Sequence, residues 1–235
     1  MKQLEIAFEQ LNIETDVETI AKFEKYMKLV LDWNNKINLT AITDEADFIK
    51  KHFIDSVLCV DFEQVKKAGT FIDVGTGAGF PGVPLALIFP DKQFLLMDSV
   101  GKKIKVVSEM LEELGILNVK TVHARAEDLA HKKEYREKFD ICVSRAVANL
   151  ATLSEYCLPF VNMGGAFISY KGSDIDDELK NANNAIEKLG GQIVDVRKVT
   201  LSNFELDHNI ITITKVRQTP VKYPRKAGMP TKQPL

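Results

Sequence analysis

From residue 66 onward, short apolar runs alternate with stretches that have helical periodicity. This alternation constrains the fold more than any other feature of the sequence. When a helix connects two successive strands, the second strand can pair in parallel with the first. The expected strands are residues 70–74, 93–98, 119–123, 140–144 and 166–171, and helices are expected between them, including 102–114 and 150–158. The sequence therefore predicts an α/β fold around a parallel sheet.

The two flanks of this central part have different patterns. Apolar residues three or four apart indicate an amphipathic helix that starts at Val17, with Asp16 placed as its cap, and a second helix is expected over 43–58. The β-rich runs 192–199 and 209–216 predict an antiparallel pair that closes the sheet. We therefore expect a helical extension over residues 1–65, a central domain over 66–216 and a C-terminal arm over 217–235.

Composition excludes several classes of protein. With 45% apolar and 27% charged residues, the chain resembles folded globular domains rather than disordered or collagen-like chains. The longest apolar stretch, 83–90, is far shorter than the roughly 20 residues of a membrane-spanning helix, and no signal-peptide pattern is present. We expect a cytoplasmic protein without membrane segments. Cys59, Cys142 and Cys157 are odd in number and widely spaced, so they are predicted to be buried apolar residues.

The C-terminal arm is basic although the whole chain has a net charge of −2. Lys215 to Leu235 contain six basic residues and no acid, so the other 214 residues carry −8. Four prolines in this segment argue against a helix or a central strand, so we expect an extended arm that follows the last strand and lies outside the carboxyl edge of the sheet. The arm is then a solvated tail, a contact for RNA phosphates, or a segment that packs back through Tyr223. The candidate phosphate contacts are Lys222, Arg225, Lys226 and Lys232.

A glycine-rich turn follows the first predicted strand, where residues 71–82 are Phe-Ile-Asp-Val-Gly-Thr-Gly-Ala-Gly-Phe-Pro-Gly. Glycines allow a backbone to approach a ligand where a Cβ would collide, so the turn indicates a nucleotide-like ligand. Two patterns fit. Gly75, Gly77 and Gly79 form G-x-G-x-G, and Gly77, Gly79 and Gly82 form the G-x-G-x-x-G of dinucleotide enzymes.

Acidic residues near the ends of three successive strands help to decide between S-adenosylmethionine and NAD as the ligand of this turn. Asp73 would suit a cationic amino group and repel a pyrophosphate, which favours S-adenosylmethionine over NAD. Asp98 is placed to accept hydrogen bonds from both ribose hydroxyls of either cofactor. Glu127, or backbone beside it, is placed to hold the adenine amino group. Singly, Asp98 and Glu127 are also ordinary acids at helix N-termini. Together the three lie where open α/β sheets bind ligands.

Motifs over nearly the whole chain fit one family pattern. They are residues 73–82, Asp98-Ser99, Arg125-Ala126-Glu127, Val143-Ser144-Arg145-Ala146, and the flanking signatures 33–40, 51–56 and 223–230. With these motifs the chain resembles the RsmG (GidB) family of small-subunit ribosomal RNA methyltransferases. The glycine motif is shared by methyltransferases at large, whereas the flanking signatures are more specific.

The resemblance implies a Rossmann-like, seven-stranded S-adenosylmethionine-dependent methyltransferase fold. It implies methyl transfer to N7 of a guanine in 16S rRNA, conventionally position 527, with naked rRNA or a small-subunit assembly particle as substrate. It also implies cofactor contacts at Gly75, Phe80, Ala126, Glu127 and Arg145.

The residues fit this chemistry independently of the family name. Guanine N7 carries an in-plane lone pair and no proton, so its methylation needs no general base. The strand 140–144 leads into Ser144-Arg145-Ala146, which contains neither the Asn/Asp-Pro-Pro-Tyr motif nor a Pro-Cys nucleophile. The four histidines lack metal-ligand spacing. We therefore expect no catalytic acid or base and no metal, with catalysis by alignment, which can supply roughly 7–11 kcal/mol.

Several polar and cationic residues are candidate RNA or cofactor contacts. Arg145 is predicted to clamp the cofactor carboxylate or an RNA phosphate, or else to form a structural salt bridge. Lys171 has a similar position after strand 166–171. Lys36 and Asn38 are predicted RNA contacts, although an Asn-rich helix end is also an ordinary C-cap. Two alternatives stay open: an NAD-dependent oxidoreductase and a non-catalytic rRNA-binding or ribosome-assembly factor.

Overall fold

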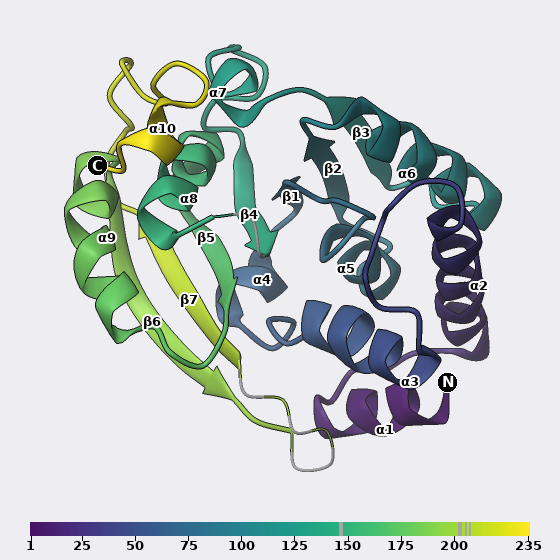
Figure 1. Cartoon of the computed structure of the whole chain (residues 1–235). Coiled ribbons are helices and arrows are strands. Elements are labelled where there is room, and N and C mark those ends of the chain that lie inside the picture. Colours follow the sequence, from purple (N-terminus) through teal and green to yellow (C-terminus); the bar gives the residue numbers. More distant parts are fainter. Residues whose placement is uncertain (146–147, 202–203, 205, 207) are drawn as a thin grey trace.

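A single seven-stranded sheet organises the chain (Figure 1). The computed structural model describes residues 1–145, 148–201, 204, 206 and 208–235, so Ala146 of the motif above lies outside the described residues. The strand order is β3-β2-β1-β4-β5-β7-β6. The strands are β1 (Thr70–Val74), β2 (Gln93–Asp98), β3 (Val119–His123), β4 (Phe139–Arg145), β5 (Val161–Lys171), β6 (Gly191–Val199) and β7 (His208–Lys215).

The pairing confirms the predicted mixture of parallel and antiparallel strands. β1 to β5 pair in parallel, and β7 runs antiparallel to both β5 and β6. β5 starts five residues before the predicted strand. The early part of β5 contains Gly164 and Gly165, which interrupt the apolar pattern from which strands are predicted. A Cβ on Gly165 would lie 2.5 Å from the carbonyl oxygen of Asp140. Glycine there allows β4 and β5 to approach closely.

Helices cover both faces of the sheet (Figure 1). They are α1 (Lys2–Gln10), α2 (Val17–Asn34), α3 (Glu45–Phe48), α4 (Glu63–Lys67), α5 (Gly82–Ile88), α6 (Gly101–Leu114), α7 (Ala126–Leu129), α8 (Leu150–Cys157), α9 (Asp176–Lys188) and α10 (Met229–Lys232). Alternate strand residues enter two separate cores: Phe71 packs with the N-terminal helices, α5 and α6, whereas Ile72 packs with α7, α8 and α9. Among the described residues, no helix has the length and hydropathy to cross a membrane.

The N-terminal extension agrees in outline with the prediction. Asp16 caps α2 by accepting a hydrogen bond from the Thr19 N–H at 2.7 Å. The second predicted helix is divided into α3 and a π-helical segment, Ile49–Ile54. The short helices α1 and α4 were not predicted. α4 crosses residue 65, the expected end of the extension. All three cysteines are buried and free, as predicted.

The expectation that prolines exclude a helix from residues 217–235 is wrong for Met229–Lys232, which forms α10. Pro230 occupies the first turn of this helix. A backbone N–H has no intrahelical partner there, so the missing donor costs nothing. The arm lies against the helices α7 and α8, on the opposite side of the molecule from α1 and α2 (Figure 1).

We expect Tyr26→Phe to destabilise the protein by about 1–3 kcal/mol, because it leaves a buried carbonyl group without its donor. Tyr26 is fully buried, stacks on Phe53 and donates its hydroxyl to the carbonyl oxygen of Ala78 at 2.6 Å. This bond joins α2 to the glycine-rich turn. Urea denaturation measures the loss. Tyr135→Phe, at a partly buried tyrosine, is the control, and an equal small loss in both variants would contradict the prediction.

Candidate functional site

A buried carboxylate holds the glycine-rich turn that follows β1. One oxygen of Asp73 accepts hydrogen bonds from the Thr76 hydroxyl at 2.6 Å and the Gly82 N–H at 2.8 Å, so it ties the two ends of the turn together. The other oxygen, Oδ1, has no hydrogen-bond partner in the described part of the chain. Asp73 is only 1% exposed, and burial raises its pKa to about 7. It lies beneath the turn, so its contact with a cofactor amino group stays a prediction.

Most backbone N–H groups of the turn are directed to acceptors inside the protein. Gly75 and Thr76 both donate to the carbonyl oxygen of Met97 in β2, at 2.9 and 3.0 Å. Gly77 donates to the carboxylate of Asp98 at 2.9 Å. The N–H groups of residues 79 and 80 donate to the carbonyl oxygen of Thr76. A dinucleotide turn presents such groups to the pyrophosphate, so this turn is not built as a pyrophosphate cradle.

Gly77 and Gly79 of the turn are required to be glycine for different structural reasons. Gly77 has a φ of +61°, and a Cβ there would meet no atom within 4 Å, so its backbone conformation is what requires glycine. Gly79 has a φ of +105°, and a Cβ there would collide with the Tyr26 hydroxyl. The packing of α2 against the turn therefore also depends on Gly79.

Two pockets meet at the carboxyl edge of the sheet, with Gly75 and Asp98 lining both. The first, which we name the Glu127 pocket, has a volume of about 530 Å³. The second, the Arg145 pocket, has a volume of about 570 Å³. The Glu127 pocket is lined in addition by Ala126, Glu127, Asn149 and Gly228, and the Arg145 pocket by Gly77, Phe80, His52 and Arg145. The turn and β2 thus bring most of the predicted cofactor residues together.

Arg145 at the end of β4 is held by the N-terminal extension. Its guanidinium donates to the carboxylate of Asp55 at 2.5 Å and to the carbonyl oxygen of Lys51 at 3.1 Å. Asp55 is almost fully buried and also bonds to His208. Burial alone would raise the pKa of Asp55, but the bond from His208 and the charge of Arg145 hold it below its usual value. The structural salt bridge considered for Arg145 is therefore present, at the edge of a pocket.

His52 is a neutral part of the same network. Its ring stacks on Phe80 with centroids 4.4 Å apart, its Nδ1 lies 3.2 Å from the Arg145 guanidinium, and its Nε2 lies 2.7 Å from the Thr40 hydroxyl. Burial and the positive charge of Arg145 lower its pKa to about 3. Because Arg145 has only donors, Nδ1 is the acceptor and its lone pair is used within the protein. The geometry therefore makes His52 a poor candidate for a general base.

The other candidate RNA contacts divide into exposed and internally bound side chains. Lys171 donates to Glu178 and to the carbonyl oxygen of Ala148, both at 2.7 Å, and so supports the segment before α8. Lys36 and Asn38 are exposed beyond the end of α2. The Lys36 ammonium lies 4.6 Å from the centre of the Trp33 ring.

The arm is not the extended segment that we expected. Arg225 forms an ion pair at 2.6 Å with Glu155, whose side chain is fully buried. Gly228 lines the Glu127 pocket, so the expectation that the arm lies outside the carboxyl-edge site is wrong. Packing on α8 and α7 favours the interpretation in which the arm packs back on the domain. Lys222 and Lys226 are exposed.

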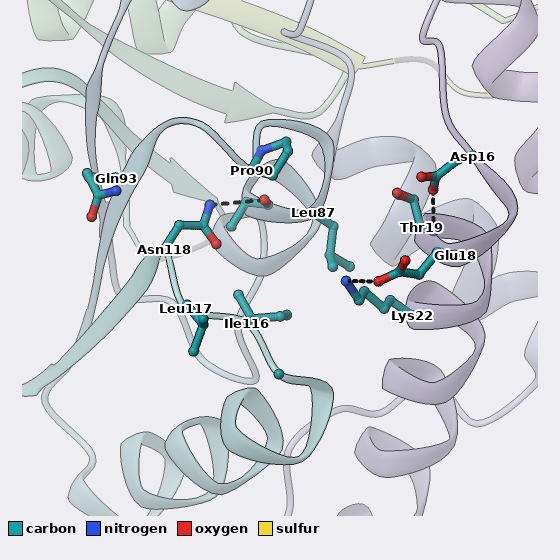
Figure 2. A pocket seen from close by; sticks show the side chains of 12 residues that line it. Asp16, Glu18, Thr19, Lys22, Leu87, Pro90, Gln93, Ile116, Leu117 and Asn118 are labelled. Carbon is teal, nitrogen blue, oxygen red and sulfur yellow. Dashed lines mark hydrogen bonds and ion pairs between the residues drawn. The ribbon is translucent and has the colours of Figure 1, made fainter.

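A third pocket lies at the amino edge of the sheet, between α2, α5 and the segment that enters β3 (Figure 2). Its polar groups complete local structure. Asp16 caps α2, and Lys22 pairs with Glu18 at 2.8 Å. Asn118 donates to the carbonyl oxygens of Ala86 in α5 and of Phe89 just after it. This pocket therefore has less chemistry to offer a ligand than the two at the carboxyl edge.

The sequence reasoning missed several residues of the site. It did not propose His52, Asp55 or His208, although His52 and Asp55 stand three residues apart and so share a helix face. That spacing was an available signal. No comparable spacing existed for Gly228 and Thr231, because only the docking of the arm brings them to the Glu127 pocket. Gly228 stands in the signature 223–230, which indicated the family but not a place in the site.

Comparison with known proteins identifies the family. The GidB family model, described as rRNA small subunit methyltransferase G, matches residues 19–206. The chain belongs to the GidB family. A family member from Clostridium novyi is 48% identical over 232 residues, which cover 99% of this chain and 96% of that protein. One from Alkaliphilus oremlandii is 49% identical over 225 residues, 96% of this chain and 94% of that protein. Both are named ribosomal RNA small subunit methyltransferase G.

Solved structures confirm the predicted fold of this GidB family member. A putative O-methyltransferase from Klebsiella pneumoniae superposes with a TM-score of 0.57 at 16% identity, over 90% of this chain and 96% of that one. At this identity the likeness shows the Rossmann-like methyltransferase fold alone. Among the described residues, no group of three or more His, Cys, Asp or Glu side chains is arranged to hold a metal ion.

We expect Asp73→Asn to change how stability depends on pH. The folded carboxyl has a pKa of about 7 against an ordinary value of 3.8, so between these values the folded state binds a proton that the unfolded state lacks. The wild-type free energy of unfolding, measured relative to Asp73→Asn, should therefore fall as pH rises from about 4 to about 7. The asparagine keeps an oxygen for Thr76 and Gly82. Urea denaturation across this range measures the difference, and a constant difference would contradict the prediction.

Proposed function

We propose that this chain transfers a methyl group from S-adenosylmethionine to N7 of a guanine in 16S rRNA. The observation that carries the proposal is the carboxyl edge of the sheet, where a turn with internally bonded N–H groups adjoins Asp98 and two pockets. The relatives named rRNA small subunit methyltransferase G support the class of substrate.

The residues at this edge fit S-adenosylmethionine. The carboxylate of Asp98 lies where the two pockets meet, and each oxygen accepts one backbone N–H, from Gly77 and from Val100. A carboxylate oxygen has a second lone pair, so both remain able to accept a ribose hydroxyl. We assign the adenine end to Ala126 and Glu127. When bound, the cofactor supplies a methyl group made electrophilic by its sulfonium centre.

We assign the methionine end to the side of the turn that faces the Arg145 pocket, formed by Gly75, Gly77 and Phe80. Arg145 carries five N–H donors, and three bonds to described residues leave capacity for a carboxylate or a phosphate. Asp73 adds a negative charge beneath the same turn when it is ionised. An acid in that place favours a cationic amino group over a pyrophosphate.

The Arg145 pocket suits an acceptor that needs no deprotonation. The Nδ1 lone pair of His52 is used by Arg145, and a pKa of about 3 makes His52 a poor proton acceptor. Guanine N7 attacks through a lone pair that carries no proton. The residues of the site therefore act by holding and orienting the two substrates, an effect that can contribute roughly 7–11 kcal/mol.

Lysines and one asparagine around the site are the proposed RNA contacts. Lys51 and Lys103 line the Arg145 pocket, and we add them to the exposed Lys36, Asn38, Lys222 and Lys226. The ion pairs of Lys171 and Arg225 favour positioning roles for these two residues. A non-catalytic rRNA-binding factor is the competing function. Tritium transfer from labelled S-adenosylmethionine, tested on naked 16S rRNA and on small-subunit particles, separates the two.

We expect Asp98→Ala to weaken binding of S-adenosylhomocysteine by about 1.5–3 kcal/mol, because hydrogen bonds to a charged group are lost. Calorimetry measures the affinity. Asp91→Ala is the matched control, because this exposed acid lies just before β2, whereas Asp98 is the last residue of β2. Wild-type affinity in a folded Asp98→Ala protein would remove Asp98 from the site, and binding of NADH by the wild type would favour the oxidoreductase.

We expect the single-turnover rate of methyl transfer, at saturating substrates, to be nearly constant from about pH 6.5 to 8.5, since no protein group gains or loses a proton in the step. The product identifies the methylated atom. Methylation at N7 makes the guanine cationic and its ring labile, so borohydride and aniline should cleave the RNA at that nucleotide. Asp73 has a pKa of about 7, so the rate is also measured in Asp73→Asn. Methylated RNA that resists cleavage, or a rate that still follows one ionisation in Asp73→Asn, would contradict N7 attack without a base.

A further inference from the structure

Residues 223–232, which we name the C-terminal strap, are anchored to α8 by a buried ion pair. Two guanidinium nitrogens of Arg225, Nε and Nη2, lie 2.6–3.1 Å from the two carboxylate oxygens of Glu155. The backbone N–H of Arg225 also donates to Glu155, at 2.7 Å. Such a bidentate contact fixes both the side chain and the backbone at this point.

Further hydrogen bonds hold the strap along its length. Arg136 donates to the carbonyl oxygen of Tyr223 at 2.9 Å, and His131 bonds to that of Pro224 at 2.8 Å. Thr152 in α8 donates its hydroxyl to the carbonyl oxygen of Pro230 at 3.0 Å. The acceptors are backbone carbonyl oxygens, so these bonds set the path of the strap whatever its side chains are.

The inner side of the strap lies at the Glu127 pocket. The Gly228 N–H donates to Glu127 Oε1 at 3.1 Å, and Gly228 and Thr231 both line the pocket. Tyr156 of α8 also lines it and bonds to the Thr231 hydroxyl at 2.9 Å. The segment matched by the family model ends at residue 206, so Gly228 and Thr231 lie outside it, whereas Glu127 and Tyr156 lie within it.

We propose that the C-terminal strap is a wall of the adenosine part of the cofactor site, and that Arg225 and Glu155 are the positioning pair that holds it there. This inference rests on the proposed function, in which the cofactor occupies the Glu127 pocket. The Gly228 N–H fixes the orientation of Glu127 and leaves its other oxygen to accept the adenine amino group. Displacing the strap removes both this orientation and one side of the pocket.

The test uses the full-length double variant Arg225→Met/Glu155→Gln. Removing Arg225 alone would leave the charge of Glu155 buried and unpaired, which destabilises the whole protein, whereas the double variant leaves no such charge. Lys226→Ala is the matched control, because this exposed lysine lies in the strap beside Arg225. Affinity for S-adenosylhomocysteine is measured by calorimetry. Trypsin cleavage after Lys226 reports whether the strap is docked.

We expect the double variant to bind S-adenosylhomocysteine about tenfold more weakly or worse, which corresponds to about 1.4 kcal/mol. Lys226→Ala should bind as the wild type does. In the wild type, saturating S-adenosylhomocysteine should slow cleavage after Lys226. Wild-type affinity in a double variant that trypsin cleaves faster would overturn the proposal. So would a wild-type cleavage rate that the cofactor product leaves unchanged, and this measurement does not depend on the variant folding.

The same measurements separate this proposal from the proposed function. A wild-type protein that binds no S-adenosylhomocysteine contradicts the proposed function and the strap proposal with it. A wild type that binds S-adenosylhomocysteine but transfers no methyl group to rRNA contradicts the proposed function alone. A wild type that binds and methylates, together with a double variant of unchanged affinity, contradicts the strap proposal alone.

Discussion

The hydrogen bonds between the turn after β1 and the end of β2 are the interaction on which the site depends. The carbonyl oxygen of Met97 accepts two N–H groups of the turn, and Asp98 accepts a third. These bonds exist because β1 and β2 are adjacent parallel strands, with Val74 in register with Met97. They fix the turn against one strand end and engage three of its donors. The edge that results suits a cofactor recognised by acceptors rather than by a phosphate cradle.

The N-terminal helices complete the site from the other side. The buried pair of Asp55 and Arg145 joins the extension to the end of β4, and Tyr26 joins it to the turn. Breaking a buried ion pair by removing one partner costs about 3–5 kcal/mol, so the extension is coupled to the catalytic edge in stability as well as in position. The pocket proposed for the guanine is therefore formed jointly by the extension and the sheet.

The basic C-terminal arm shows why local composition does not settle the role of a charge. Arg225 is paired with buried Glu155, and Lys215 is fully buried against Glu137 at 3.0 Å. The sequence alone does not tell whether a lysine or arginine lies in solvent, binds a phosphate or pairs with a carboxylate from another helix. The docked arm instead carries exposed lysines on its outer side and lines the Glu127 pocket on its inner side.

Local sequence patterns were enough to predict the sheet, the glycine turn, and Asp98 and Glu127 near successive strand ends. These features depend on local periodicity, on glycine conformation and on the rule that the carboxyl ends of parallel strands share one edge. The tertiary structure was needed to show that Asp73 lies under the turn, that His52 is held neutral by Arg145 and that Gly228 reaches Glu127. Asp73 bonds to a nearby residue, but its burial depends on packing that its local sequence does not reveal. The other two contacts join residues 93 and 101 positions apart, and no local pattern encodes such partners.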